Sequence, residues 1–170
     1  MKGGRHLILI GLPGCGKSTV GKKLSQTLSL PFADLDEVIE KETGVNIPDF
    51  FALHGEAAFR EAETAALRRC IQLPAGVIAT GGGAVLREEN RTLMHQHGIV
   101  LFLDRPTEDI EKTLDHAMHP TLQDTTLEKL SEVRRPLYLS CADHVIVEQK
   151  IGGAVQRCAA LWRQYEVSYH

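Results

Sequence analysis

GLPGCGKS, residues 11–18, follows the apolar run HLILI at residues 6–10 and fits the pattern G-x-x-x-x-G-K-[ST]. In this pattern, glycines let a loop between a strand and a helix pass close to phosphate oxygens, and the helix N-terminus adds partial positive charge. We therefore predict nucleotide binding, with Lys17 at the β- and γ-phosphates and Ser18 as a ligand of Mg²⁺. The alternative is a glycine-rich turn that contains Lys-Ser by chance. The predicted ATP-binding residues of this loop are Gly14, Cys15, Gly16, Lys17, Ser18 and Thr19.

The composition is that of one globular domain. The chain has 170 residues, a formal net charge of −3 and 43% hydrophobic residues, and it contains no long run of Lys or Arg. These features argue against a protein that binds nucleic acid or a membrane, and they favour a small-molecule partner. The four cysteines are far apart and form no C-x-x-C pair, which argues against a disulfide framework or a structural zinc and fits a reducing cytoplasm. Cys15 is interpreted as a small residue that fills a tight loop, in preference to an acidified, redox-sensitive thiol.

Short β-branched runs alternate with segments of helical periodicity, a pattern typical of a parallel sheet whose strands are joined by helices. Five strands are predicted, at His6–Ile10, Pro31–Leu35, Val77–Ala79, Ile99–Leu103 and His144–Val147. The first helix is expected over Lys17–Leu28, where Val20, Leu24 and Leu28 recur on one face.

Residues 36–76, between the second and third predicted strands, are too many for a plain crossover. Helical patterns lie at Glu37–Glu42, Ile47–Leu53 and Ala57–Ile71, with breaks at Gly44 and Gly55. They predict a helical subdomain inserted over the strand ends, and insertions at such places commonly bind a ligand. Residues Asp115–Thr126 lack an apolar period and are expected to form a mobile loop.

FADLD, residues 32–36, ends the second predicted strand with two aspartates, Asp34 and Asp36. Residues two apart lie on the same side of an extended chain, and ligands bind at strand ends in open α/β sheets. One carboxylate is therefore expected to contribute to a Mg²⁺ site and the other to accept a proton from a substrate hydroxyl. The alternative is that one of them only caps the helix that begins near Glu37.

Three further motifs carry side chains or backbone suited to a small anionic substrate. Arg60 and Glu63, in FREAE, lie on one helical face and taken alone predict an ordinary surface ion pair, although the planar fork of Arg60 also suits a substrate carboxylate. Gly81-Gly82-Gly83 is too costly in backbone entropy for a plain turn, which favours close approach of the backbone to a ligand. Arg134 and Arg135, in RRPLY, are either further guanidinium ligands or solvated charges.

Taken together, GLPGCGKS, FADLD, FREAE, TGGG and RRPLY resemble the shikimate kinase family in order and approximate spacing, over essentially the whole chain. The resemblance implies a three-layer α/β P-loop kinase fold, similar to that of nucleoside monophosphate kinases, with a central five-stranded parallel sheet. It implies a core at about 1–35, 74–112 and 126–170, a substrate-binding subdomain at about 36–73 and a lid at about 113–125. It also implies that a cytoplasmic monomer transfers the γ-phosphate of ATP to the 3-hydroxyl of shikimate, with Mg²⁺ as cofactor, in the biosynthesis of chorismate and aromatic amino acids.

Carried over by position, the resemblance makes Lys17 the γ-phosphate ligand and Ser18 the direct Mg²⁺ ligand, with Asp34 in the outer coordination sphere of the ion. Asp36 orients the substrate hydroxyl and accepts its proton. The remaining positions implied for substrate and nucleotide are the carboxylate ligands Arg60 and Arg134, the substrate-lining backbone of Gly81, Gly82 and Gly83, the Arg60 partner Glu63, and Lys112, which stands where the family tends to place an Arg against adenine.

One position departs from the family pattern. Where the family lid reads Arg-Pro, this chain has His119-Pro120. The Arg folds over the transferring phosphate, and cationic clamps of this kind lower the barrier to phosphoryl transfer. Either His119 is protonated beside phosphates, or another cation replaces it, or activity is weak. We expect an active enzyme in which His119 acts with Lys17 and Asp36 and contributes less as the pH rises. His116 and His119 lack a third ligand nearby, which argues against a metal site.

Two other functions stand as alternatives. The first is a kinase for another small hydroxy acid, such as a gluconate-type acceptor, or for a nucleoside monophosphate; FADLD and FREAE favour a carboxylated acceptor with several hydroxyls over a nucleotide. The second is a nucleotide-binding paralogue that has lost catalysis. His119 alone supports it, because the other expected site residues are present.

Overall fold

The fold is seen in a computed structural model that describes residues 6–169, so the outermost residues of the predicted core, 1–5 and 170, lie outside the described range. Within that range, five strands form one parallel sheet in the order β2-β3-β1-β4-β5. The strands are β1 (His6–Ile10), β2 (Phe32–Asp34), β3 (Gly76–Ala79), β4 (Gly98–Leu103) and β5 (His144–Ile146). The five-stranded parallel sheet expected from the sequence is confirmed.

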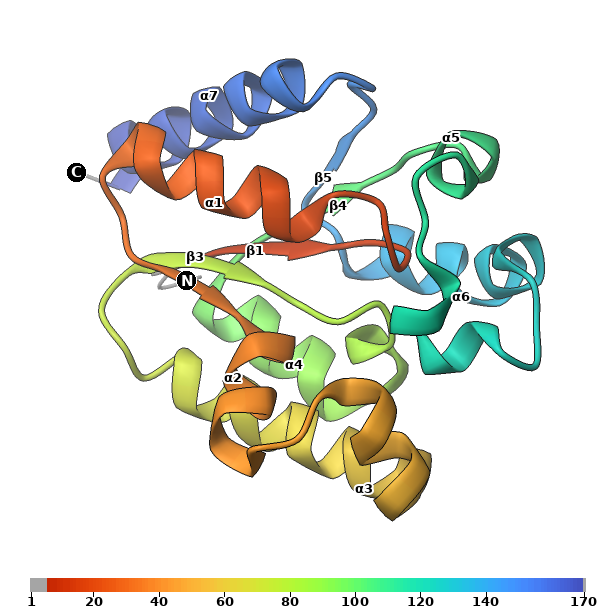
Figure 1. Cartoon of the computed structure of the whole chain (residues 1–170). Coiled ribbons are helices and arrows are strands. Elements are labelled where there is room, and N and C mark those ends of the chain that lie inside the picture. The colour runs from red at the N-terminus through yellow and green to blue at the C-terminus, as the bar shows by residue number, and fades with distance from the viewer. Residues whose placement is uncertain (1–5, 170) are drawn as a thin grey trace.

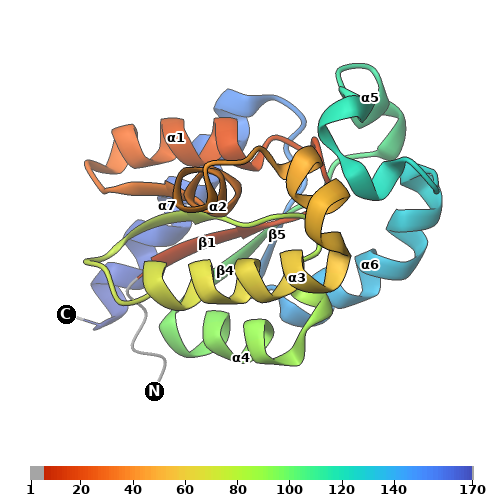
Figure 2. The same cartoon turned by 60° about the horizontal axis from the view of Figure 1, so that its bottom comes forward.

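The three central strands, β3, β1 and β4, are buried at every residue. Their nearly continuous apolar sequence follows from this position, since both faces of the sheet are covered by helices. α1 (Lys17–Leu28) and α7 (Ile151–Tyr169) pack on one face, while α4 (Glu88–His97) and α6 (Leu127–Cys141) pack on the other (Figures 1 and 2). The sheet is therefore the middle of three layers.

The register of the strands brings three loops to one edge of the sheet. Ala79 of β3 pairs with Leu9 of β1 on one side and with Asp34 of β2 on the other. Thr80, the residue after β3, continues the contact because its amide and its hydroxyl both donate to the carbonyl of Leu9, at 3.1 and 2.9 Å. The phosphate loop after β1, the end of β2 and the three glycines after β3 consequently emerge side by side.

The first helix begins as the sequence predicts. Gly16, its N-cap, has φ 102°, a left-handed conformation that glycine adopts without strain. Val20 and Leu24 are buried on the sheet side, and Gly21 lets the helix approach Phe32 of β2 closely. The phosphate loop is thus held between a buried strand and a tightly packed helix.

The predicted helical insertion consists of α2 (Leu35–Thr43) and α3 (Ile47–Cys70). The break expected at Gly55 is confirmed, since its φ of 83° and ψ of 173° interrupt α3. The expected start of α2 at Glu37 and the expected end of β2 at Leu35 are wrong. The strand ends at Asp34 because the side chain of this residue caps the helix, which therefore begins at Leu35.

The segment 113–125, called the lid segment below, contains two short 3₁₀ turns, His116–Met118 and Pro120–Leu122. Leu122 is buried, and both turns lie against α3. Two more short helices are Ala84–Leu86, after the three glycines, and α5 (Thr107–Glu111), ahead of the lid segment. No helix among the described residues is both long enough and apolar enough to span a membrane.

Two helix glycines give opposite predictions for stability. A Cβ at Gly21 would lie 2.6 Å from Cε2 of Phe32, so Gly21→Ala is expected to lower the free energy of unfolding by about 1–3 kcal/mol. At Gly152 in α7 an added Cβ meets no heavy atom within 4 Å, so Gly152→Ala, the matched control, should raise it by about 0.5 kcal/mol through helix propensity. Chemical denaturation measures both; stabilisation by Gly21→Ala would contradict the close packing of α1 on β2.

Candidate active site

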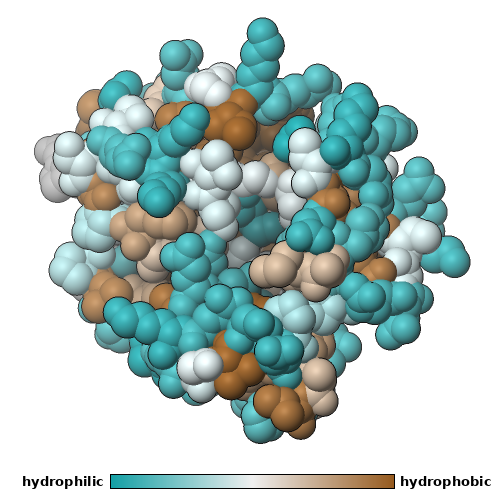
Figure 3. All heavy atoms as spheres, in the orientation of Figure 1, coloured by the Kyte–Doolittle hydropathy of each residue, from teal (hydrophilic) through white to brown (hydrophobic). Residues whose placement is uncertain are grey.

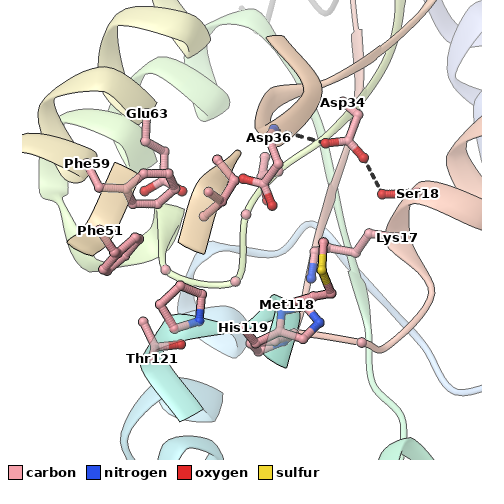
Figure 4. Close-up of a pocket in the computed structure, with 18 of the residues that line it drawn as sticks. Lys17, Ser18, Asp34, Asp36, Phe51, Phe59, Glu63, Met118, His119 and Thr121 are labelled. Carbon is pink, nitrogen blue, oxygen red and sulfur yellow. Dashed lines mark hydrogen bonds between the residues drawn. The ribbon is translucent and has the colours of Figure 1, made fainter. Parts of the chain in front are cut away.

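A cavity of about 290 Å³ opens at the edge where the loops after β1, β2 and β3 meet. Figure 3 shows the molecular surface hollowed near the middle of this face, and the side chains labelled in Figure 4 surround the hollow. Within the described chain, six segments line the cavity: the phosphate loop with the start of α1, the β2–α2 junction, the first half of α3, the glycine loop, the lid segment and α6 at Arg134. The charged residues and the histidine that line it are Lys17, Asp34, Asp36, Arg60, Glu63, Arg134 and His119.

The phosphate loop holds Lys17 over its own backbone. The Nζ atom of Lys17 donates to the carbonyls of Gly11 and Leu12, at 2.7 and 2.8 Å. The Cys15 side chain is buried, and a Cβ on Gly11 would lie 2.7 Å from its Sγ atom. This close packing agrees with the interpretation of Cys15 as a small residue in a tight loop.

Asp34 has two functions at once. One carboxylate oxygen, Oδ1, accepts from the amides of Asp36 and Glu37, at 2.9 and 3.3 Å, and caps α2. The other, Oδ2, accepts a hydrogen bond from the Ser18 hydroxyl (Figure 4). The capping alternative is therefore confirmed for this residue, and its second oxygen stays available to the site, where the role predicted for it remains a prediction. A hydroxyl and a carboxylate are oxygen donors of the kind that Mg²⁺ prefers, so the chemistry of this pair fits the predicted ion.

Asp36 faces the cavity for a reason other than the one predicted. It does not lie on an extended chain with Asp34 but in the first turn of α2, which turns its side chain toward the glycine loop. Its Oδ1 atom is buried without a hydrogen-bond partner in the described structure. Burial raises the pKa of Asp36 to about 7, with Asp34 and Glu63 adding to the effect and Lys17 opposing it. A carboxyl group with such a pKa is suited to accept a proton near neutral pH.

Arg60 and Glu63 form a buried pair, and the interpretation as a surface ion pair is wrong. Nη1 of Arg60 donates to Oε1 of Glu63 at 3.0 Å, Nη2 reaches Glu56 at 3.3 Å, and Glu63 is 0% exposed. Burial raises the pKa of Glu63, while the guanidinium of Arg60 opposes the rise. Oε2 of Glu63 and Nε of Arg60 have no partner within the described residues. These two buried atoms could therefore still form a hydrogen bond in the wall of the cavity.

The three glycines are required by the side chains of the site itself. A Cβ on Gly81 would lie 2.5 Å from Oε2 of Glu63, and a Cβ on Gly83 would lie 2.3 Å from Nη1 of Arg60. At Gly82 it would lie 2.8 Å from Cδ of Pro13 in the phosphate loop. The close approach predicted for the glycine backbone is therefore to Glu63, Arg60 and the phosphate loop, and all three glycines also line the cavity.

Of the two arginines in RRPLY, only Arg134 reaches the cavity. It is 4% exposed, and burial lowers its pKa. Arg135 points to the surface, where it pairs with Asp104 at 2.8 Å. Arg135 is therefore a surface charge, and Arg134 is the one of the two that stays a candidate ligand.

His119 and Lys112, the two residues whose roles depend on a bound nucleotide, have different surroundings. His119 lines the cavity close to Lys17 and Met118 (Figure 4), and burial, with the charge of Lys17, lowers its pKa, while Asp115 opposes the shift. His116 pairs with Glu111. Lys112 is exposed, pairs with Asp109 at 3.2 Å and does not line the cavity. Among residues 6–169, no group of three or more metal-binding side chains was found.

Several cavity residues were not predicted. Phe51, Phe59, Met118 and Thr121 form part of its wall. Of these, Phe59 belongs to the FREAE motif, but the motif predicted no role for it. An aromatic side chain in an amphipathic helix has the same sequence signal whether it faces the core or a cavity, so no pattern distinguishes these residues. The lid residues carry no periodic signal at all.

Comparisons with known proteins agree with the geometry. Residues 13–158 match the family model described as shikimate kinase. A shikimate kinase of Burkholderia pseudomallei is 43% identical over 146 residues, covering 83% of this chain and 79% of the relative, and one of Neisseria gonorrhoeae is 43% identical over 155 residues, covering 88% and 91%. A solved structure of shikimate kinase from Acinetobacter baumannii in complex with shikimate has a TM-score of 0.86 and 34% identity, covering 98% of this chain and 96% of that one.

The raised pKa of Asp36 predicts that its ionisation costs stability. An unfolded Asp ionises near pH 4 and the folded one near pH 7, so stability is lost as the pH rises across that window. Asp36→Asn, which removes the ionisable group, should raise the free energy of unfolding by about 4 kcal/mol at pH 8 and by about 1 kcal/mol at pH 5. Urea titrations at both pH values, without nucleotide or metal, measure this. Asp124→Asn, at an exposed lid position, is the control. Equal destabilisation by Asp36→Asn at both pH values would contradict the assignment.

Proposed function

Because this chain belongs to the shikimate kinase family, we propose that it transfers the γ-phosphate of ATP to the 3-hydroxyl of shikimate, giving shikimate 3-phosphate and ADP. The observation that carries this proposal is one cavity in which a phosphate loop faces two buried guanidinium groups and a carboxyl group with a pKa of about 7. Such a site suits a small acceptor with one carboxylate and a hydroxyl to be phosphorylated. We further propose that the protein is a cytoplasmic monomer that acts in chorismate and aromatic amino acid biosynthesis.

On the nucleotide side, the backbone of Gly14, Gly16 and Thr19 would face the phosphates. Lys17 would exchange the carbonyls of Gly11 and Leu12 for phosphate oxygens, which are better partners for an ammonium group. Ser18 and Asp34 would hold Mg²⁺, which when bound neutralises charge on the β- and γ-phosphates. We propose Cys15, in the same loop, as a further ATP-binding residue. Lys112 would contact adenine after releasing Asp109.

On the acceptor side, Arg60 and Arg134 would bind the shikimate carboxylate. Both are buried, so a carboxylate between them is shielded from water, and the unpartnered Nε of Arg60 offers a further donor. The backbone of Gly81–Gly83 would line the ring of the acceptor, and Glu63 would hold Arg60 in place. Residues 36–73 would thus form the substrate-binding subdomain.

Asp36 would orient the 3-hydroxyl and accept its proton as the oxygen attacks the γ-phosphate. Its free Oδ1 atom gives the hydroxyl a place to donate, and its pKa lets it take up a proton near neutral pH. The remaining contribution is alignment of donor and acceptor and exclusion of water by the lid segment at 113–125.

The proposal predicts ADP release that requires shikimate. A coupled assay with ATP and Mg²⁺, run from pH 6 to 9, would compare shikimate with gluconate and AMP as control acceptors. We expect turnover with shikimate and only background release with the controls. Turnover with gluconate or AMP instead would identify another small-molecule kinase, and ATP binding without turnover on any acceptor would identify a paralogue that has lost catalysis.

The lowered pKa of His119 predicts a gain from a permanent cation at this position. His119→Arg should raise kcat at pH 8 by about tenfold, because an Arg is charged there whereas burial and Lys17 keep His119 neutral. At pH 6 the gain should be smaller, since phosphates favour protonation of the histidine. The control is His116→Arg at a lid position that is paired with Glu111. Absence of a gain at pH 8 would show that another cation already neutralises the phosphate.

A further inference from the structure

Gly55 interrupts α3 with a backbone conformation that other residues rarely adopt. Its φ of 83° and ψ of 173° combine a positive φ with an extended ψ, a region in which essentially only glycine is found. A Cβ at this position would meet no heavy atom within 4 Å, and residues 52–57 around it are exposed. Glycine is therefore required here by the backbone conformation and not by a lack of space.

The break folds the first half of α3 against the second. In a continuous helix, Phe51 and Phe59 would be eight residues and about 12 Å apart along the axis. In the structure their ring centroids are 4.6 Å apart, and those of Phe50 and Phe59 are 6.1 Å apart. Figure 2 shows the two halves of α3 running in different directions, and Figure 4 shows the rings of Phe51 and Phe59 beside each other. The contact between these rings thus depends on the change of direction at Gly55.

The three phenylalanines that meet here have different environments. Phe50 is 8% exposed and belongs to the core, so burial alone accounts for its position. Phe51 is only partly buried, yet it lines the cavity, as does Phe59. The guanidinium carbon of Arg60 lies 5.4 Å from the centroid of the Phe59 ring, within the range of a cation–π contact. Phe51 and Phe59 therefore form an apolar wall beside one of the two buried guanidinium groups of the cavity.

We propose that Gly55 is a positioning residue for the acceptor, whose backbone conformation places Phe51 against Phe59 in the cavity wall next to Arg60. The inference rests on the proposed function, because it assumes that the acceptor carboxylate binds Arg60. The apolar face of the acceptor ring would then pack on the two phenyl rings while its carboxylate pairs with the guanidinium group. Gly55 itself does not line the cavity, so its replacement should weaken acceptor binding only through Phe51 and leave nucleotide binding unchanged.

The test is a double-mutant cycle between Gly55→Ala and Phe51→Ala, with kcat, the KM for shikimate and the Kd for ATP measured for each variant. Gly55→Ala adds one methyl group in open space, and Phe51 is only partly buried, so both variants are expected to fold, which thermal unfolding checks. Each single change should raise the KM for shikimate about tenfold, change kcat less than about threefold and leave the Kd for ATP within about twofold. In the Phe51→Ala background, Gly55→Ala should add no further rise.

Gly44→Ala is the matched control for the backbone effect. Gly44 lies in the same insertion, at the end of α2, has a φ of 71° and likewise leaves an added Cβ in open space. Because Gly44 does not line the cavity and does not separate Phe51 from Phe59, its replacement should lower the unfolding temperature without raising the KM for shikimate.

An equal rise in KM in both Phe51 backgrounds would show that Gly55 does not act through Phe51. An equal rise with Gly44→Ala would reduce the effect to backbone strain anywhere in the insertion. Loss of the folded state in Gly55→Ala, or a lower unfolding temperature with an unchanged KM, would make Gly55 a residue of the fold only. Each of these results overturns the inference while the wild type still turns over shikimate. Absence of wild-type turnover would instead overturn the proposed function, and the inference with it.

Discussion

Parallel pairing of β1 with β3, and of β3 with β2, is the constraint on which the rest of the structure depends. It places the carboxyl ends of three strands at one edge, with Leu9, Ala79 and Asp34 in register. The phosphate loop, the capping aspartate and the glycine loop then follow directly from these strand ends, while α3 and α6 bring Arg60 and Arg134 to the same cavity. The apolar strands and the tight contact of Gly21 with Phe32 stabilise this edge, so the core determines the geometry of the site.

The cavity contains charges that the protein alone does not satisfy. Three permanently cationic side chains and three carboxyl groups line it, yet Oδ1 of Asp36, Oε2 of Glu63 and Nε of Arg60 lack partners within the described structure. Burying such groups is unfavourable, and the raised pKa values of Asp36 and Glu63 express that cost. An acceptor with a carboxylate and hydroxyls offers complementary groups. Its binding would give these buried groups the partners that they lack, and would therefore be favourable.

The sequence predicts this fold well because its signals are local. The phosphate loop, the five strands and the break at Gly55 each follow from periodicity or from glycine chemistry. The site is less predictable because it depends on distance in space. Arg60 and Glu63 have the spacing of a surface pair, and only the glycine loop packed against them makes the pair buried. Asp36 was misplaced because a cap at Asp34 ended the strand early. No sequence pattern predicts the hydrogen bond from the Tyr138 hydroxyl to Gly82, because the two residues are 56 positions apart.

The lid segment shows how a departure from a family pattern changes the distribution of charge. Residues 113–125 contain no Lys or Arg, and the titratable bases among them are His116 and His119. His116 is already paired with Glu111, and burial lowers the pKa of His119, as does the same Lys17 that would bind phosphate. Permanent positive charge at the cavity therefore comes from Lys17, Arg60 and Arg134 in the body of the protein.

The lid segment contributes Met118, Pro120 and Thr121 to the cavity wall. On closure, their main effect would be to exclude water. Exclusion of water strengthens each interaction of those core cations with the substrates, and in this way a lid without a permanent cation would still contribute to phosphoryl transfer.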